Sequence, residues 1–143
     1  MKPLRDLYHV SSLYGTEEDE YEPLIESIGV KILVKVEDNS YQGDAICLLQ
    51  DENDENRYGV LVFGFGSCSY CDALQGCKSY EELEELRDTL ANSIFWGSKE
   101  TVSDYILKKH DWKGTHLSPR LVYKFIEKLK IKSILGGTKN ENL

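Results

Sequence analysis

The stretch Val30-Lys31-Ile32-Leu33-Val34-Lys35-Val36 decides the expected fold, because it carries the clearest strand pattern in the chain. Its β-branched residues alternate with two lysines, which is typical of a strand with one buried face. Two more apolar runs, at residues 41–49 and 57–63, predict two more strands, and residues 50–56 predict a polar loop between them. Strands joined by short polar segments predict an antiparallel meander. Gly43 indicates a β-bulge in the second strand.

After these strands the apolar spacing changes to that of helices. Ser79 and Glu82 form a capping box before a stripe of Leu83, Leu86, Leu90 and Ile94, and this helix is expected to end at residues 95–97. Ser98 and the pair Ser118-Pro119 predict the starts of two further helices. The sequence therefore predicts an α+β domain, with a three-stranded antiparallel meander followed by three or four helices packed on the sheet. The leucine stripe is the expected cover of the Val30–Val36 face.

The length and composition indicate one globular domain. The chain has 143 residues, of which 41% are apolar and 29% are charged. We expect a single domain over residues 1–135 and a flexible, polar C-terminal tail over 136–143. No apolar run approaches the roughly 18 residues of a membrane span, and the N-terminus lacks the apolar segment of a secretory signal. These features favour a soluble, cytoplasmic protein.

The charge of the chain is divided unequally along the sequence. Residues 1–98 contain 20 acidic and seven basic residues, a net charge of −13, whereas residues 99–143 contain five acidic and ten basic residues, a net charge of +5. An acidic surface repels phosphate groups, so direct nucleic-acid binding is not expected. It instead favours a basic protein partner, because complementary charge steers association. The lysines of the basic segment are interpreted as a solvated helix face.

Three cysteines in a short segment give the strongest chemical signal. Cys68, Cys71 and Cys77 have the spacing of thiolate ligands to a structural zinc ion, which needs four ligands in a tetrahedron. A turn can direct the first two sulfur atoms inward, and a short helix from Asp72 can bring Cys77 to the same point. The spacing does not identify the fourth ligand. The candidates are His116, His110, His9 and Cys47.

Among these four candidates, His116 is favoured because it lies in a polar loop, whereas Cys47 lies in a predicted strand and its side chain is expected to face the core. Two other interpretations of the cysteines stay open. All of them can be reduced thiols packed as small apolar residues. Alternatively, Cys68 and Cys71 can form a reactive dithiol, because a CxxC motif between a strand and a helix start is the setting of thioredoxin-like chemistry.

The first long helix carries a set of acidic residues that is a candidate partner-binding surface. Glu81 and Glu85 are one turn apart, about 6 Å along the axis, as are Glu84 and Asp88. A solvated helix face explains these acids adequately, because the helix dipole favours acidic residues near its N-terminus. The functional interpretation is an acidic ladder that a basic protein groove binds in place of phosphates.

The segment Gly64-Phe65-Gly66-Ser67-Cys68-Ser69-Tyr70-Cys71-Asp72-Ala73-Leu74-Gln75-Gly76-Cys77 resembles a family of small acidic proteins of bacterial phages and mobile elements. The resemblance extends from about Tyr41 to Trp112, and the cysteine motif is its specific part. The family brings no activity and no catalytic residue with it. Small acidic phage proteins of this kind include anti-CRISPR proteins that inhibit Cas9, which are similar in size and charge.

The leading hypothesis is therefore a non-enzymatic, zinc-stapled binding protein of a phage or mobile element. It would present an acidic surface to a basic host nucleic-acid-binding defence protein, such as a CRISPR effector nuclease, in the host cytoplasm. The alternative from a different class is a thiol-disulfide oxidoreductase that uses Cys68 and Cys71. A third interpretation is a housekeeping adaptor whose cysteines only pack. The sequence assigns no catalytic residue and names neither the partner nor the oligomeric state.

Overall fold

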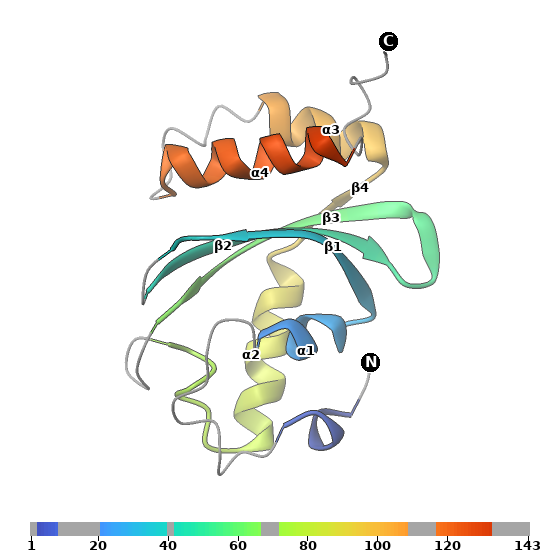
Figure 1. Ribbon diagram of the computed structural model, residues 1–143. Coiled ribbons are helices and arrows are strands. Elements are labelled where there is room, and N and C mark those ends of the chain that lie inside the picture. Colours follow the sequence, from blue (N-terminus) through green and yellow to red (C-terminus); the bar gives the residue numbers. More distant parts are fainter. Residues whose placement is uncertain (1–2, 9–20, 40–41, 67–71, 109–116, 133–143) are drawn as a thin grey trace.

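A four-stranded antiparallel sheet, in the order β1-β2-β3-β4, forms the centre of the protein (Figure 1). The computed structural model describes residues 3–8, 21–39, 42–66, 72–108 and 117–132. The strands are β1 (Val30–Glu37), β2 (Gly43–Asp51), β3 (Asp54–Phe65) and β4 (Phe95–Gly97). The α+β class and the three-strand meander agree with the prediction. The fourth strand does not, because residues 95–97 were expected only to end a helix.

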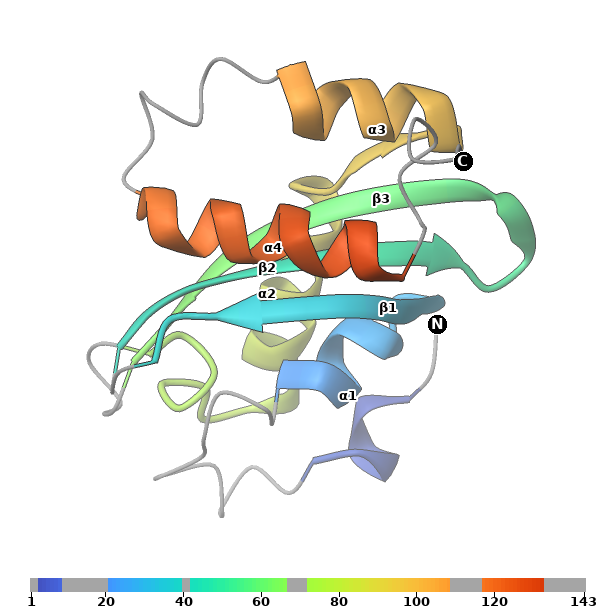
Figure 2. The ribbon, with the colours of Figure 1, turned by 45° about the horizontal axis from the view of Figure 1, so that its top comes forward.

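Helices cover both faces of this sheet. The helices α1 (Tyr21–Glu26) and α2 (Tyr80–Asn92) lie against one face, together with the short 3-10 helix η1 (Leu4–Asp6). The helices α3 (Lys99–Lys108) and α4 (Pro119–Ile131) lie against the other face (Figures 1 and 2). We call these two faces the α2 side and the α4 side. Among the described residues, no helix is long and apolar enough to span a bilayer.

A β-bulge at Leu33 interrupts the pairing of β1 with β2. Ile32 pairs with Leu49 and Val34 pairs with Leu48, so that Leu33 is one extra residue on β1. Side chains of a strand alternate between the two faces with a period of two residues. Because of the one inserted residue, every side chain after the bulge points to the face opposite to the one that simple alternation would predict.

The bulge divides β1 between two hydrophobic cores. Val30 and Ile32 pack on the α2 side, whereas Val34 and Val36 pack on the α4 side. The expectation of one buried face over Val30–Val36, covered by the leucine stripe of α2, is therefore wrong. On the α2 side the helix that contacts β1 is α1, and on the other side it is α4. Val30 and Ile32 belong to the same hydrophobic cluster as Leu83 and Leu90 of α2.

The hairpin between β2 and β3 is tighter than predicted. Its turn consists of Glu52 and Asn53, and the Asn53 N–H donates to Asp51 Oδ1 at 2.8 Å. Residues 50–56, predicted as a polar loop, therefore lie mostly in the two strand ends. The predicted bulge at Gly43 is also wrong, because Gly43 pairs with Phe65 at the start of a ladder that stays in register as far as Gln50.

The predicted helix starts are confirmed. Ser79 Oγ accepts from the Glu82 N–H at 3.1 Å, and Ser118 Oγ accepts from the Leu121 N–H at 3.1 Å. Ser98 Oγ likewise accepts from the Thr101 N–H at 3.2 Å. These bonds satisfy donors that a helix leaves free at its N-terminus. The apolar stripes that follow point inward, as the buried side chains of Leu83, Leu90, Val102, Ile106, Leu121, Val122, Phe125 and Leu129 show.

Gly59 permits the close approach of β4 to β3. It pairs with Trp96, and a Cβ atom at this position would lie 2.6 Å from Ile94 Cγ2 and 3.1 Å from Trp96 Cε3. Ile94 and Trp96 thus occupy the space that a side chain at position 59 of β3 would fill. Because β4 has only three residues, this packing is important for its position in the sheet.

We predict that Gly59→Ala lowers the free energy of unfolding by about 2 kcal/mol, because the added methyl group overpacks the contact with Ile94 and Trp96. Gly64→Ala is the matched control in the same strand, since the nearest atom to its Cβ would be 3.6 Å away. Urea unfolding followed by circular dichroism measures both effects. Equal stability of the two variants would contradict this account of β4.

Candidate functional site

The structure describes only part of the predicted zinc site. Cys77 and Cys47 are described, and both are buried, free thiols. Among the described residues, no group of three or more His, Cys, Asp and Glu side chains could hold a metal ion. The zinc site stays a prediction, because its other candidate ligands lie outside the described residues: Cys68, Cys71, His9, His110 and His116.

Cys47 lies in the middle of β2 and faces the core on the α2 side, as expected from its position in a strand. Its side chain has 0% exposure, and burial raises the pKa of the thiol to about 12, although the nearby Lys35 ammonium lowers it. Cys47 is therefore a protonated core residue at neutral pH, with the low reactivity of a buried thiol.

Cys77 occupies a different environment, at the junction between the cysteine segment and α2. Its thiol donates to the Ala73 carbonyl oxygen at 3.3 Å. Burial raises the pKa of this thiol to about 11, and the carboxylates of Glu82, Asp72 and Glu85 contribute further. The negative charges that disfavour a bare thiolate here would favour a bound cation.

The buried carboxylate of Asp72 is the centre of a hydrogen-bond network beside Cys77. Its Oδ1 atom accepts from the Tyr21 hydroxyl at 2.8 Å and from the Gln75 N–H at 3.0 Å. Its Oδ2 atom accepts from the Gly66 N–H at 2.8 Å. Asp72 is 3% exposed, so these donors replace the water that the carboxylate loses.

Two more hydrogen bonds complete this network. The Tyr21 hydroxyl accepts from the Leu74 N–H at 3.1 Å, and Gln75 Nε2 donates to the Gly66 carbonyl oxygen at 3.1 Å. Burial, together with the charge of Asp72, raises the pKa of Tyr21 far above its usual range, so the hydroxyl stays a donor. Gly66 and Asp72, which flank the segment that contains Cys68 and Cys71, are thus held together and joined to α1.

The residues after Asp72 form one helical turn. The Gly76 N–H donates to the Asp72 carbonyl oxygen at 3.0 Å, which is the spacing of an α-helical hydrogen bond. This is a single turn and not the short helix that was expected from Asp72. Glu82 then contacts the Lys78 N–H, one residue before the cap, while Ser79 accepts from Glu82.

The candidate partner-binding residues Glu81, Glu84, Glu85 and Asp88 are all exposed on α2. Glu82 is exposed beside them. The only basic residue of this helix, Arg87, is buried, with 8% exposure. The exposed charged side chains of α2 itself are therefore all acidic, although Arg5 of η1 stacks on Tyr80 at its beginning.

Five exposed bases of the described residues lie on the opposite side of the sheet, whereas Arg5 stacks on Tyr80 of α2 and Lys78 is exposed just before this helix. The exposed cations of α4 and its C-cap are Arg120, Lys124, Lys128, Lys130 and Lys132. Because α2 and α4 cover opposite faces (Figure 1), the charge asymmetry of the sequence becomes a separation between two surfaces. The acidic surface of α2 is thus not neutralised by neighbouring lysines of α4.

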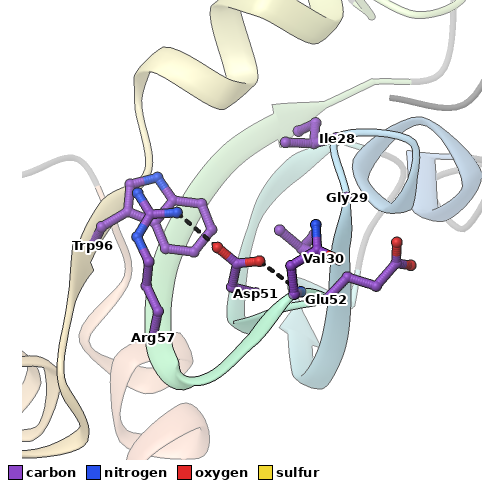
Figure 3. Close-up of a pocket in the computed structure, with 8 residues that line it drawn as sticks. Ile28, Gly29, Val30, Asp51, Glu52, Arg57 and Trp96 are labelled. Atoms are coloured by element: carbon purple, nitrogen blue, oxygen red, sulfur yellow. Dashed lines mark hydrogen bonds and ion pairs between the residues drawn. The ribbon is translucent and has the colours of Figure 1, made fainter.

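A pocket of about 400 Å³ lies at the end of the sheet, between the β2–β3 turn and the turn before β1 (Figure 3). The Arg57 guanidinium stacks on the Trp96 ring at 3.9 Å from its centroid and bonds Asp51 Oδ2 at 2.9 Å. The Asn53 N–H and Arg57 together lower the pKa of Asp51. The pocket is lined by Ile28, Gly29, Val30, Asp51, Glu52, Asn53, Arg57 and Trp96.

Comparisons with protein-family models, with curated proteins and with solved structures each find no match to this chain. The site is therefore interpreted from its own geometry. The sequence correctly predicts the exposed acids of α2, from their positions between the leucines. It does not predict the network of Asp72 or the pocket beside Trp96, because both are formed by residues far apart in the chain.

We predict that Asp72→Ala lowers the free energy of unfolding by about 3 kcal/mol, because buried donors lose their acceptor. Tyr21→Phe removes one donor and should cost about 1 kcal/mol. Asp88→Ala, on the exposed face of α2, is the control and should change stability by less than about 0.5 kcal/mol. Chemical denaturation of the three variants tests this order. A loss for Asp72→Ala no greater than for Asp88→Ala would contradict it.

Proposed function

We propose that this chain is a non-enzymatic binding protein of a phage or mobile element. Its acidic face on α2 would bind a basic host defence protein in the host cytoplasm and occupy a groove that otherwise holds nucleic acid. A CRISPR effector nuclease is the partner that fits this role, in the manner of anti-CRISPR proteins. The surface that supports the proposal consists of Glu81, Glu84, Glu85 and Asp88.

The observation that carries this proposal is the unmixed charge of the exposed side chains of α2 itself. The acids project into solvent at intervals of one helical turn, and the helix exposes no base among them. An exposed series of negative charges on a rigid helix can replace phosphates in a basic groove, because phosphate contacts are mainly electrostatic. Complementary potentials also accelerate the encounter of two such surfaces.

Zinc would give this surface a rigid base. In the proposal Cys68, Cys71 and Cys77 hold a structural zinc ion with a fourth ligand, which is His116, His110, His9 or Cys47. The network of Asp72 supports this arrangement, because it holds Gly66 and the turn before Cys77 together and joins both to Tyr21 of α1. A metal at this point would supply folding energy and no chemistry.

A charge-matched pair of variants tests the acidic face. In the first, the proposed acids are neutralised as Glu81→Gln, Glu84→Gln, Glu85→Gln and Asp88→Asn. The control has the same change in net charge at acids away from the surface of α2: Glu26→Gln, Glu55→Gln, Glu100→Gln and Glu127→Gln. Binding to RNA-loaded Cas9, and inhibition of DNA cleavage, should weaken at least about tenfold in the first variant only.

The wild-type affinity should also fall as salt rises, because screening weakens contacts between exposed charges. Equal loss in the two variants would show that only net charge matters, which contradicts a localised surface. Absence of binding to Cas9 would remove this partner. Capture from a bacterial lysate, with the α2 variant as a control, then asks whether any basic protein depends on these acids.

Metal analysis of the reduced protein tests the zinc site. We expect about one zinc per chain, as in structural sites, with loss of the metal in Cys77→Ser. Individual substitutions of His116, His110, His9 and Cys47 by alanine identify the fourth ligand. A metal-free protein with rapid alkylation of Cys68 at neutral pH would contradict the zinc site and favour the thiol-disulfide oxidoreductase.

A further inference from the structure

The pocket beside Trp96 combines an apolar wall with acidic groups. In Figure 3, Trp96 and Arg57 lie on one side, Ile28 and Val30 lie on the other, and Asp51 lies between them. The Glu52 N–H donates to the Gly29 carbonyl oxygen at 3.0 Å, which joins the hairpin turn to the turn before β1. The pocket is thus bounded by strands and by two turns that are bonded to each other.

The charge around this pocket favours a cationic ligand. The residues that line the pocket include two acids, Asp51 and Glu52, and one base, Arg57. Arg57 is already paired with Asp51 through a bond of 2.9 Å between Nη1 and Oδ2. An anionic ligand would meet an excess of carboxylates, whereas a cation would meet attractive charge and an aromatic ring.

Arg57 itself shows which chemistry these groups accept. Its guanidinium lies 3.9 Å from the centroid of the Trp96 ring and bonds a carboxylate oxygen of Asp51. This is the pairing that proteins use to bind arginine side chains, in which an aromatic face and a carboxylate contact the same planar cation. The side chain of Arg57 is 45% exposed, so solvent and ligands reach it.

We propose that this pocket binds the side chain of a second arginine, which a protein partner presents to the chain. The aliphatic part of that side chain lies along the half-buried Ile28, and its guanidinium contacts Asp51 and Glu52. Long basic side chains bind in this way, with the apolar stem against apolar surface and the charged end at the rim. In the context of the proposed function, the arginine belongs to the basic partner, but the pocket alone is sufficient for the test.

The experiment is a nuclear magnetic resonance titration of the isotope-labelled protein with N-acetyl-L-arginine amide. Saturable shifts in the millimolar range should be centred on the Trp96 indole N–H and on the amides of Glu52 and Asn53. The citrulline analogue has nearly the same shape without the charge and should not bind. Free L-arginine, which has charged amino and carboxylate groups, serves as a second probe. Tighter binding of free L-arginine than of the amide would indicate a site for the free amino acid, and not for an arginine side chain in a peptide.

Two variants give effects of opposite sign. Glu52→Gln removes a charge from the pocket and should weaken binding about tenfold, whereas the control Glu55→Gln, on the same hairpin outside the pocket lining, should leave binding unchanged. Arg57→Ala removes the internal cation that occupies Trp96 and Asp51, and it should tighten binding about tenfold.

Shifts centred on the pocket, together with this order of affinities, support the proposal. Shifts of equal size with citrulline, shifts elsewhere on the protein, or weaker binding in Arg57→Ala would overturn it. If the pocket binds the arginine probe but the protein does not bind Cas9, only the proposed partner is contradicted. A protein that binds Cas9 without these shifts would contradict only the pocket.

Discussion

The buried carboxylate of Asp72 is the constraint on which the segment before α2 depends. It joins three parts of the chain that are distant in sequence or separated by a turn: Tyr21 of α1, Gly66 at the end of β3, and the helical turn before Cys77. Asp72 is only 3% exposed, and three donors replace the water that its oxygen atoms lose: the Tyr21 hydroxyl and the N–H groups of Gly66 and Gln75. The same contacts hold the turn that precedes Cys77, and α2 begins a few residues further on, at the Ser79 cap.

The sequence predicts those parts of the fold that depend on residues close together in the chain. It does not predict those that depend on contacts between distant segments. The serine caps depend on residues within one helix and are found as expected. Leu83 and Leu90 of the predicted stripe are buried in α2, but Leu86 is half-buried and Ile94 lies beyond the end of the helix at Asn92. The bulge at Leu33 is different, because an apolar residue between Ile32 and Val34 fits either face of the sheet. Only pairing with β2 reveals the change of face. The strand β4 is too short to give a periodic signal.

The same distinction applies to the functional surfaces. The acids of α2 are exposed because the leucines between them are buried, and this follows from helical spacing alone. Asp72 and Trp96 give no comparable signal, since neither lies in a recognisable motif. Their partners, Tyr21 and Arg57, are brought to them by tertiary contacts. Composition predicts which surface is charged, but not which side chains form a network or a pocket.

Among the described residues, the acidic helix α2 and the basic helix α4 lie on opposite faces of the sheet (Figure 1), and this separation contributes an electric dipole moment. In the field of a strongly charged body such a molecule experiences a torque as well as a force. A positively charged neighbour would turn it so that α2 leads and α4 trails, before any atoms touch. The fold therefore selects an angle of approach, in addition to an affinity, through the distribution of its charges.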